Sequence, residues 1–316
     1  MPFGFPDTGI YTRDELMIIC AAREIEDGDV CIVGQGLPIV AGGLAKALYS
    51  PNIVLCTEAG LINFNPYMAP QHIADPCCTK GFSASADLVD MFTRYTGRGY
   101  VDVCFLGCAQ IDRYGNINTT LIGDYFGDFD VRFPGAGGNP DFLGYSKKTI
   151  LTMRGGAFVN KLDYFTSPGY LTGGNSRYEA GLPEGTGPHM LITTSGVFRF
   201  DPETKEIYLA ETFPGITVED IKKQVPWDLK VAPDVHEAKG PTEDEVSWIR
   251  AFDPVSAAGR TNAIGLIARS MGERKKKLAA RRAALAEADV KKPLKKEGEL
   301  KKEGEVPKQP EPPKEG

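Results

Sequence analysis

Strands and helices alternate along the first sixty residues of this chain, and this order restricts the possible folds more than any other feature. Thr12 and Glu15 have the spacing of a capping box, and apolar residues follow at helical intervals. Short apolar strands are predicted at 30–33 and 52–56, with a glycine turn and a helical stretch between them. Because parallel strands need crossover helices of this kind, we predict an α/β fold, an open and mostly parallel sheet flanked by helices.

The rest of the body continues this pattern. Apolar runs predict two further strands, and three later segments are strand-like with turns between them, which indicates a second sheet region or antiparallel additions. Two capped helices are expected to close the body. The strands are predicted at 101–106 and 149–153, the strand-like segments at 157–165, 189–193 and 196–209, and the helix starts near Thr217 and Thr242.

The composition changes towards the carboxyl terminus. The motif LKKEGE occurs twice, at 294–299 and 300–305, in a stretch of Lys, Glu and Pro that has too few apolar residues to form a core. We therefore predict a domain over 1–255, a helical extension over 256–290 and a disordered basic tail over 291–316. We expect the tail to be a solubilising extension, and contact with acidic partners is the alternative.

The distribution of charge restricts the partners. The chain has a net charge of −6, and residues 272–316 contain 14 Lys and Arg against 9 Asp and Glu, so the preceding residues carry −11. An acidic body argues against general nucleic-acid binding. No apolar run reaches the roughly eighteen residues of a membrane span, and the first residues lack the pattern of a signal peptide. We expect neither nucleic acid nor membrane as a partner.

The cysteines indicate a compartment. There are seven, an odd number, all within the first 108 residues, and several lie in apolar strands or helices. This pattern differs from a secreted disulfide framework and favours a reducing cytoplasm. Cys77-Cys78 lack a second pair at zinc-site spacing, so we expect structural thiols and no metal site.

A glycine turn follows the first predicted strand. Gly34 and Gly36 form a G-x-G turn that opens a helix, which suits a backbone that approaches a phosphate. The third glycine of a dinucleotide fingerprint would fall at position 39, which is Ile39. A nicotinamide site is therefore disfavoured, and a tight turn beside some other ligand is still possible.

Glu58 follows the second predicted strand and precedes Ala59-Gly60, which are too small to shield it. In open α/β sheets, ligands bind beyond the carboxyl ends of the strands. A carboxylate there can be a base, a metal ligand or a nucleophile. The chain has only three histidines, so a histidine relay and a His-rich metal site are poorly supported. An ordinary surface glutamate is the alternative.

The wider sequence resembles the beta subunits of class I CoA-transferases, most closely those of the glutaconate CoA-transferase type. The similarity runs in order along most of residues 10–255, and Glu58-Ala59-Gly60 lies where the family has its catalytic glutamate. The other segments that carry it are Val33–Pro38, Gly107–Asn118, Ile122–Tyr125, Arg132–Gly138, Tyr164–Gly169 and Gly181–Pro183.

This resemblance implies a double displacement on Glu58. The carboxylate would attack the thioester of an acyl-CoA and form an acyl–glutamyl anhydride. This anhydride would be converted to a glutamyl-CoA thioester, and an acceptor acid would then take the CoA. Coenzyme A would be substrate and covalent intermediate, and no cofactor would be bound permanently. The G-x-G-G loop, Gly135, Ala136, Gly137 and Gly138, would supply backbone donors for the oxyanion and contacts to CoA. A homologous alpha subunit is the implied partner in a hetero-oligomer.

Several polar residues have less certain roles. Gln110, Asp112, Asn116 and Asn118 are expected on the same edge, where they either hold the Glu58 loop by hydrogen bonds or stabilise a turn. Asp124 and Tyr125 either line the site or pack. Three arginines are candidates for CoA phosphates or a substrate carboxylate, with a solvated side chain as the alternative for each. They are Arg98, Arg113 and Arg132.

We therefore predict a CoA-transferase beta subunit that acts on an acyl-CoA, with a dicarboxylic acyl group favoured. Position 59, which is polar in some members of the family, is Ala here. Relatives with this fold include hydrolases and decarboxylases of CoA thioesters, in which the glutamate is changed or displaced. A hydrolase or decarboxylase of a CoA-linked dicarboxylate is one alternative, and a non-catalytic partner subunit is another.

Overall fold

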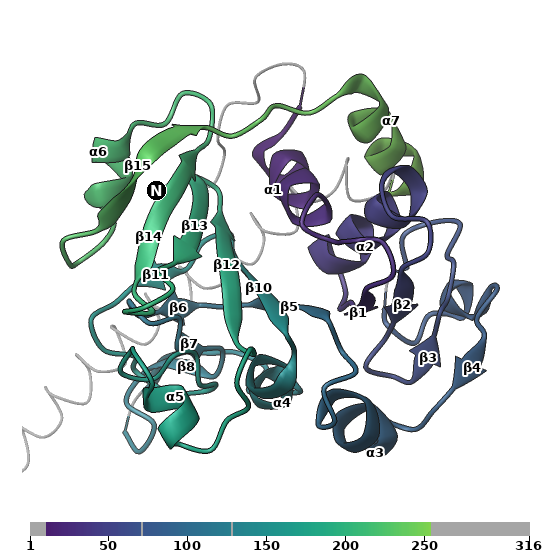
Figure 1. Cartoon of the computed structure of the whole chain (residues 1–316), viewed down its shortest axis with the longest axis horizontal. Coiled ribbons are helices and arrows are strands. Elements are labelled where there is room, and N and C mark those ends of the chain that lie inside the picture. Colours follow the sequence, from purple (N-terminus) through teal and green to yellow (C-terminus); the bar gives the residue numbers. More distant parts are fainter. Residues whose placement is uncertain (1–10, 71, 128, 254–316) are drawn as a thin grey trace, which may run out of the picture. The chain divides into compact units, whose positions relative to one another are not determined.

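The computed structural model describes residues 11–70, 72–127 and 129–253 of the chain. The predicted helical extension and the basic tail, 256–290 and 291–316, lie outside the described residues. Helices occupy both sides of a large sheet in the described part (Figure 1). The helices are α1 (Arg13–Ala22), α2 (Leu37–Leu48), η1 (Pro76–Thr79), α3 (Leu88–Asp90), η2 (Met91–Thr96), α4 (Asn139–Tyr145), α5 (Ser176–Glu179), α6 (Val218–Lys222) and α7 (Glu243–Phe252).

Ten strands form the main sheet, in the order β15-β14-β13-β12-β10-β5-β1-β2-β3-β4. Five neighbouring strands in its centre, β12, β10, β5, β1 and β2, are parallel, which confirms the predicted α/β fold. The strands of the main sheet are β1 (Val30–Ile32), β2 (Val54–Cys56), β3 (Leu61–Ile62), β4 (Ala84–Ser85), β5 (Val103–Gly107), β10 (Lys148–Met153), β12 (Pro188–Thr193), β13 (Gly196–Phe200), β14 (Ile207–Thr212) and β15 (Lys230–Glu237).

Two small sheets accompany the main one. The first contains β6 (Gln110–Ile111), β7 (Ile117–Asn118) and β11 (Ala157–Phe158), and the second contains β8 (Leu121–Gly123) and β9 (Phe129–Arg132). The predicted strand at 157–165 is therefore only two residues long. Asp163 is instead in a loop. Its backbone N–H donates to the side-chain Oε1 of Gln110 (3.0 Å) and not to a neighbouring strand.

Side chains alternate between two cores because helices cover both faces of the sheet. Cys31 belongs to the core beneath α1, α2 and α7, whereas its neighbour Ile32 belongs to the core beneath η2 and α4. Both faces are therefore apolar, and this is why the central strands appear in the sequence as continuous apolar runs. Thr12 and Thr242 form the predicted capping boxes of α1 and α7.

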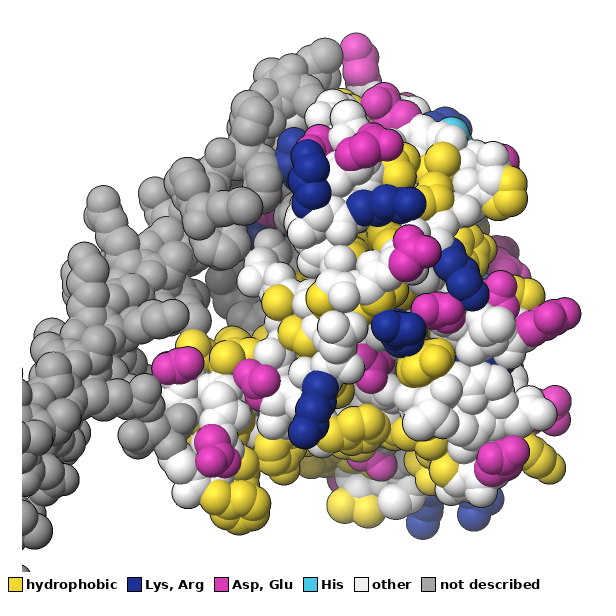
Figure 2. All heavy atoms as spheres, turned by 90° about the vertical axis from the view of Figure 1, so that its left-hand side faces the viewer, with side chains coloured by type: hydrophobic (Ala, Val, Ile, Leu, Met, Phe, Trp, Pro, Cys, Tyr) yellow, Lys and Arg dark blue, Asp and Glu magenta, His cyan; other side chains and the backbone are white. Residues whose placement is uncertain are grey.

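The edge strands of the main sheet are β4 and β15. β15 has features that protect an edge. It contains Pro233, which cannot donate to a further strand, and charged residues at both ends, Lys230 and Glu237. Figure 2 shows this side of the molecule, where acidic and basic side chains are interspersed. These features disfavour pairing with another sheet.

Among the helices of the described residues, none has the length and apolar character to cross a bilayer.

Candidate active site at the carboxyl edge of the sheet

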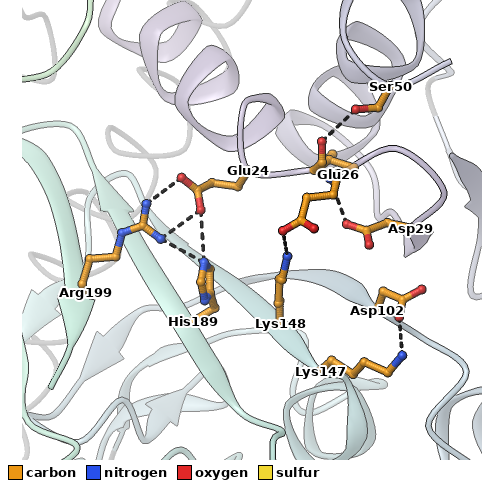
Figure 3. Close-up of polar contacts among 10 residues, drawn as sticks. Glu24, Glu26, Asp29, Ser50, Asp102, Lys147, Lys148, His189 and Arg199 are labelled. Carbon is orange, nitrogen blue, oxygen red and sulfur yellow. Dashed lines mark hydrogen bonds and ion pairs between the residues drawn. The ribbon is translucent and has the colours of Figure 1, made fainter. Parts of the chain in front are cut away.

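The two edges of the parallel strands differ in their electrostatics. At the amino edge, acidic side chains are paired with cations: Glu24 with Arg199 (2.6 Å), Glu26 with Lys148, and Asp102 with Lys147 (2.5 Å) (Figure 3). The ring Nε2 of His189 lies 3.1 Å from Glu24 Oε2. At the carboxyl edge, the chain places Glu58 directly after β2. The amino edge therefore has the character of a structural ion network, and the carboxyl edge is where reactive groups are available.

The turn that carries Glu58 is fixed by its backbone. Thr57 N–H donates to Leu61 O (3.0 Å), and Gly60 N–H donates to Thr57 O (3.0 Å). Gly60 has a φ of 97°, and a Cβ there would lie 1.9 Å from Ala86 O. Only glycine fits this position, both because of its dihedral angle and because the neighbouring backbone is so close. The turn thus holds Glu58 at one place on the edge.

Glu58 itself is half-buried, and its carboxylate has no partner among the described residues. Among the described residues, no side chain or backbone group forms a hydrogen bond or ion pair with its carboxylate, and burial raises the pKa of Glu58. A partly desolvated carboxylate without a cation is unfavourable for stability, so such groups are concentrated at functional sites. Both oxygens are available to react.

The glycine loop has the conformation that its sequence predicts. Gly135 and Gly137 have φ values of 107° and 52°, which disfavour other residues. Gly135 N–H donates to Thr119 O (3.2 Å), and Thr119 Oγ1 donates to Gly135 O (2.9 Å). Within the described part of the chain, the N–H groups of Ala136, Gly137 and Gly138 donate to no protein acceptor. Three consecutive donors are therefore free for a ligand, and that of Gly135 is not.

One segment contacts both the Glu58 turn and the glycine loop. Ala86 N–H donates to Gly60 O (2.8 Å), and six residues later the ring of Phe92 lies where a Cβ on Gly138 would be, at 2.6 Å. Phe92 also packs on Phe142 of α4, with ring centroids 5.3 Å apart. The 86–92 segment therefore links the two parts of the candidate site.

Asp112 and Asn116 stabilise the turn between β6 and β7. Asp112 Oδ1 accepts from the N–H of Tyr114 (2.9 Å), and Asp112 Oδ2 accepts from Asn116 Nδ2 (2.7 Å). Asn116 Oδ1 accepts from the N–H groups of Gly169 (2.8 Å) and Leu171 (3.1 Å). These contacts agree with the turn alternative for both residues.

Gln110 and Asn118 face each other across the same hairpin. Asn118 Nδ2 donates to Gln110 Oε1 (2.8 Å), and Asn118 Oδ1 accepts from Thr120 N–H (2.9 Å). Thr120 O in turn accepts from Phe133 N–H (2.9 Å), next to the glycine loop. No hydrogen bond of these side chains, or of Asp112 and Asn116, reaches the 57–60 turn among the described residues. Their hydrogen bonds stabilise the hairpin and the approach to the glycine loop, and not the Glu58 turn.

Comparison with known proteins gives the family. The model of the coenzyme A transferase family matches residues 15–224. The chain belongs to the coenzyme A transferase family. The B subunit of 3-oxoadipate CoA-transferase from Pseudomonas knackmussii is 38% identical over 250 residues, which cover 78% of this chain and 95% of that protein.

Solved structures of relatives have the same fold. Glutaconate CoA-transferase from Acidaminococcus fermentans superposes with a TM-score of 0.73 at 34% identity, over 79% of this chain and 98% of that chain. The decarboxylase AibA/AibB superposes with a TM-score of 0.66 at 24% identity, over 80% and 98% of the two chains, and shows the fold alone. Two of the similar CoA-transferase chains, at 38% and 35% identity, are B subunits.

The three candidate arginines lie in different places. Arg132 is next to the glycine loop, and its Nη1 donates to Thr120 O (2.5 Å) and Phe133 O (2.9 Å). Arg113 pairs with Glu206 (3.5 Å), which directly precedes β14 of the main sheet. Arg98 is exposed and precedes β5, so it is at the amino edge, opposite Glu58. Of these three arginines, only Arg132 lies where it could contact a ligand of the glycine loop.

Asp124 and Tyr125 are at the tip of the β8–β9 hairpin. Tyr125 is 52% exposed and packs on Tyr164, with ring centroids 5.2 Å apart. Asp124 Oδ1 accepts from Phe126 N–H (3.0 Å), a local turn contact. The hairpin leads directly into the glycine loop through β9.

The cysteines, all within the described residues, are free thiols. Burial raises the pKa of Cys56 to about 11 and that of Cys108 to about 12, so neither is a thiolate at neutral pH. In the described ranges, no group of three or more His, Cys, Asp or Glu side chains is arranged to hold a metal ion. Carboxylate chemistry therefore has no thiolate competitor close to Glu58.

Proposed function

We propose that this chain is the B subunit of a CoA-transferase in which Glu58 is the nucleophile. The observation that carries the proposal is the half-buried carboxylate of Glu58, unpaired among the described residues and held at the carboxyl edge by a turn that requires Gly60. A surface glutamate without function would need neither the burial nor the fixed turn. The similarity to B subunits of two CoA-transferases supports the same assignment.

The reaction is a double displacement. A Glu58 oxygen bonds to the thioester carbonyl carbon, the C–S bond breaks, and an acyl–glutamyl anhydride and CoA thiolate form. The thiolate then bonds to the glutamyl carbonyl carbon and releases the first acid, which leaves a glutamyl-CoA thioester. An acceptor carboxylate repeats these steps in reverse and leaves as the new acyl-CoA. No proton, electron or further reactant is needed.

Each addition produces an oxyanion that needs donors in fixed positions. The unused N–H groups of Ala136, Gly137 and Gly138 are our candidates, because no protein acceptor in the described residues competes for them. Gly135, whose N–H is bound to Thr119, serves to shape the loop. Arg132, at the start of the loop, is the candidate for an anionic group of CoA or substrate.

We infer that the acyl-CoA is a dicarboxylic one. Glutaconate and 3-oxoadipate, named in two relatives at 35% and 38% identity, are both dicarboxylates. Ala59 widens the space next to Glu58 and adds no polar group. The free thiols agree with a reducing compartment, and we propose the cytoplasm.

We also propose an A subunit as partner, which docks on the tip of the β8–β9 hairpin. Phe126 is 94% exposed and packs edge-on against Tyr125, with ring centroids 4.9 Å apart. Phe165 is 52% exposed, and it follows Tyr164, whose ring packs on Tyr125. Exposed aromatic clusters are typical of interface hot spots. Because this hairpin leads into the glycine loop, a subunit seated here would border the active site.

The test is a half-reaction. The A/B complex is incubated with glutaconyl-CoA or 3-oxoadipyl-CoA and no acceptor, quenched, reduced and weighed as intact protein. We expect a CoA-sized increment that maps to the peptide with Cys56, Thr57 and Glu58, and none in Glu58→Ala. Reduction removes any mixed disulfide at Cys56. The control Glu179→Ala changes an exposed glutamate on α5 and should form the adduct at the wild-type rate.

The same experiment tests the alternatives. A hydrolase would release free CoA and acid steadily without an acceptor, and a decarboxylase would release carbon dioxide with the thioester intact. Neither needs an adduct on Glu58. Either result, without adduct on rapid quenching, would reject the transferase assignment.

A further inference from the structure

Arg177 is a buried arginine that has no acidic partner in the part of the chain that the structure describes. It belongs to α5, is 4% exposed, and takes part in none of the ion pairs of the described residues. Burial lowers the pKa of Arg177 to about 10. Burying a cation without a carboxylate is costly, and the loss has to be offset by hydrogen bonds.

Backbone carbonyls take the place of a carboxylate. Nη1 donates to Pro168 O (3.0 Å) and Gly169 O (2.7 Å), and Nη2 donates to Leu143 O (2.7 Å) and Gly144 O (2.7 Å). Thr186 Oγ1 accepts from Nη2 at 3.1 Å. A lysine ammonium cannot span four carbonyls from two segments in this way, because it lacks the planar fork of arginine.

The two segments that Arg177 joins are both connected to the glycine loop. Leu143 and Gly144 are in the last turn of α4, and this seven-residue helix begins at Asn139, directly after the loop. Phe142 of α4 lies where a Cβ on Gly138 would be, at 2.6 Å. In the other segment, Thr166 Oγ1 accepts from the N–H of Thr119, which binds Gly135. Arg177 is therefore connected to the loop from both sides.

We propose that Arg177 is a positioning residue of the transfer reaction, which holds α4 and the 166–169 segment so that the glycine loop presents its N–H groups in one geometry. This inference rests on the proposed function. Arg177 contacts the carbonyls at the end of α4, and the glycine loop precedes the start of this helix. At 1.5 Å per residue, α4 separates these contacts from the loop by roughly 10 Å, so Arg177 does not touch the substrate. It acts through the helix, and its loss should affect the rate of chemistry more than substrate binding.

The test compares the buried Arg177 with the half-buried Arg199 in the A/B complex. Arg177→Met and Arg177→Lys remove the hydrogen bonds from Arg177 to the four carbonyls, and Arg199→Met removes the arginine of the amino-edge network that pairs with Glu24. All are assayed well below their melting temperatures. We expect kcat to fall about 100-fold in Arg177→Met and about tenfold in Arg177→Lys, with KM for acyl-CoA within about threefold. Arg199→Met should lose thermal stability and keep kcat within about twofold.

A second measurement separates a local from a global effect. Amide hydrogen exchange in Arg177→Lys should accelerate over residues 136–145 and remain unchanged over α1 and α2. Unchanged kcat in Arg177→Met, or an equal loss of kcat in Arg199→Met, would overturn the role of Arg177. If Arg177→Met does not assemble, Thr186→Val removes one acceptor of Nη2 and should lower kcat about tenfold, and an unchanged kcat there has the same meaning.

The outcomes distinguish this inference from the proposed function. The wild-type complex is tested first for the CoA adduct on Glu58. Absence of the adduct in the wild type rejects the assignment of Glu58. An adduct that forms in the wild type and equally fast in Arg177→Met rejects the positioning role alone.

Discussion

At the level of single residues, Glu58 and Glu24 lie near opposite edges of one sheet and have opposite surroundings. Glu58 has no partner among the described residues, and its pKa is raised by burial, so its ionised form destabilises the fold at neutral pH. We expect Glu58→Gln to leave the melting temperature unchanged or higher while transfer is abolished. A fall of several degrees in scanning calorimetry would contradict this view of an unpaired carboxylate.

The position of the Glu58 carboxylate matters as much as its charge. Glu58→Asp keeps the charge and withdraws it by about 1 Å, and an error of this size costs roughly a hundredfold in rate. We expect kcat to fall by about that factor, with the fold intact by circular dichroism. Ordinary CoA-transfer rates in Glu58→Ala would show that another group is the nucleophile, and ordinary rates in Glu58→Asp would show that the position of the carboxylate is not critical.

Glu24 gives the opposite prediction for stability. Burial alone would raise its pKa, but hydrogen bonds from His189 and Arg199 and the charge of Arg199 lower it from 4.5 to about 2. Because the folded value is the lower one, ionised Glu24 stabilises the fold above about pH 4.5, and this contribution is lost as the pH falls towards 2. Glu24→Gln should cost about 2 kcal/mol at pH 7. Urea titrations between pH 2 and 7 should also show a weaker pH dependence than in the wild type.

At the level of elements, the β2–β3 turn is the part of the site with the least tolerance. A methyl group on Gly60 would meet Ala86 O at 1.9 Å and would need an unfavourable φ. We expect Gly60→Ala to lower the free energy of unfolding by about 2–4 kcal/mol and to displace Glu58. Gly107→Ala, at the end of β5, has no atom within 4 Å of the added carbon and should change stability by less than about 0.5 kcal/mol. Equal stabilities of the two variants in urea would rule out the close contact.

At the level of the whole molecule, half of the active site is expected from another chain. We predict that the protein purifies as a complex with an A subunit, and that Phe126→Ser at the exposed hairpin weakens this complex about tenfold or more. Analytical ultracentrifugation of wild type and variant measures the effect, with exposed Tyr178→Ser on α5 as the control. Full transfer activity from this chain alone, free of any partner by mass spectrometry, would contradict the heteromer.

The local features of this protein can be read from the sequence alone. Thr12 and Thr242 predict their capping boxes because side-chain spacing alone decides whether a cap can close. The central strands and the α/β order follow from apolar runs between helices. Glu58 and the glycine loop were predicted by the resemblance to CoA-transferases, since both are contiguous motifs.

Which groups are paired and which are free depends on contacts between segments that are distant in the sequence. Asn118 binds Gln110 and Thr120, which follows from the hairpin register and not from the motif. The need for glycine at position 60 depends on Ala86, which is 26 positions further along the chain. Arg177 lies in a four-residue helix with no local sign of burial, and its acceptors come from carbonyls of distant segments. Such contacts depend on long-range packing, which residue types and their spacing do not specify.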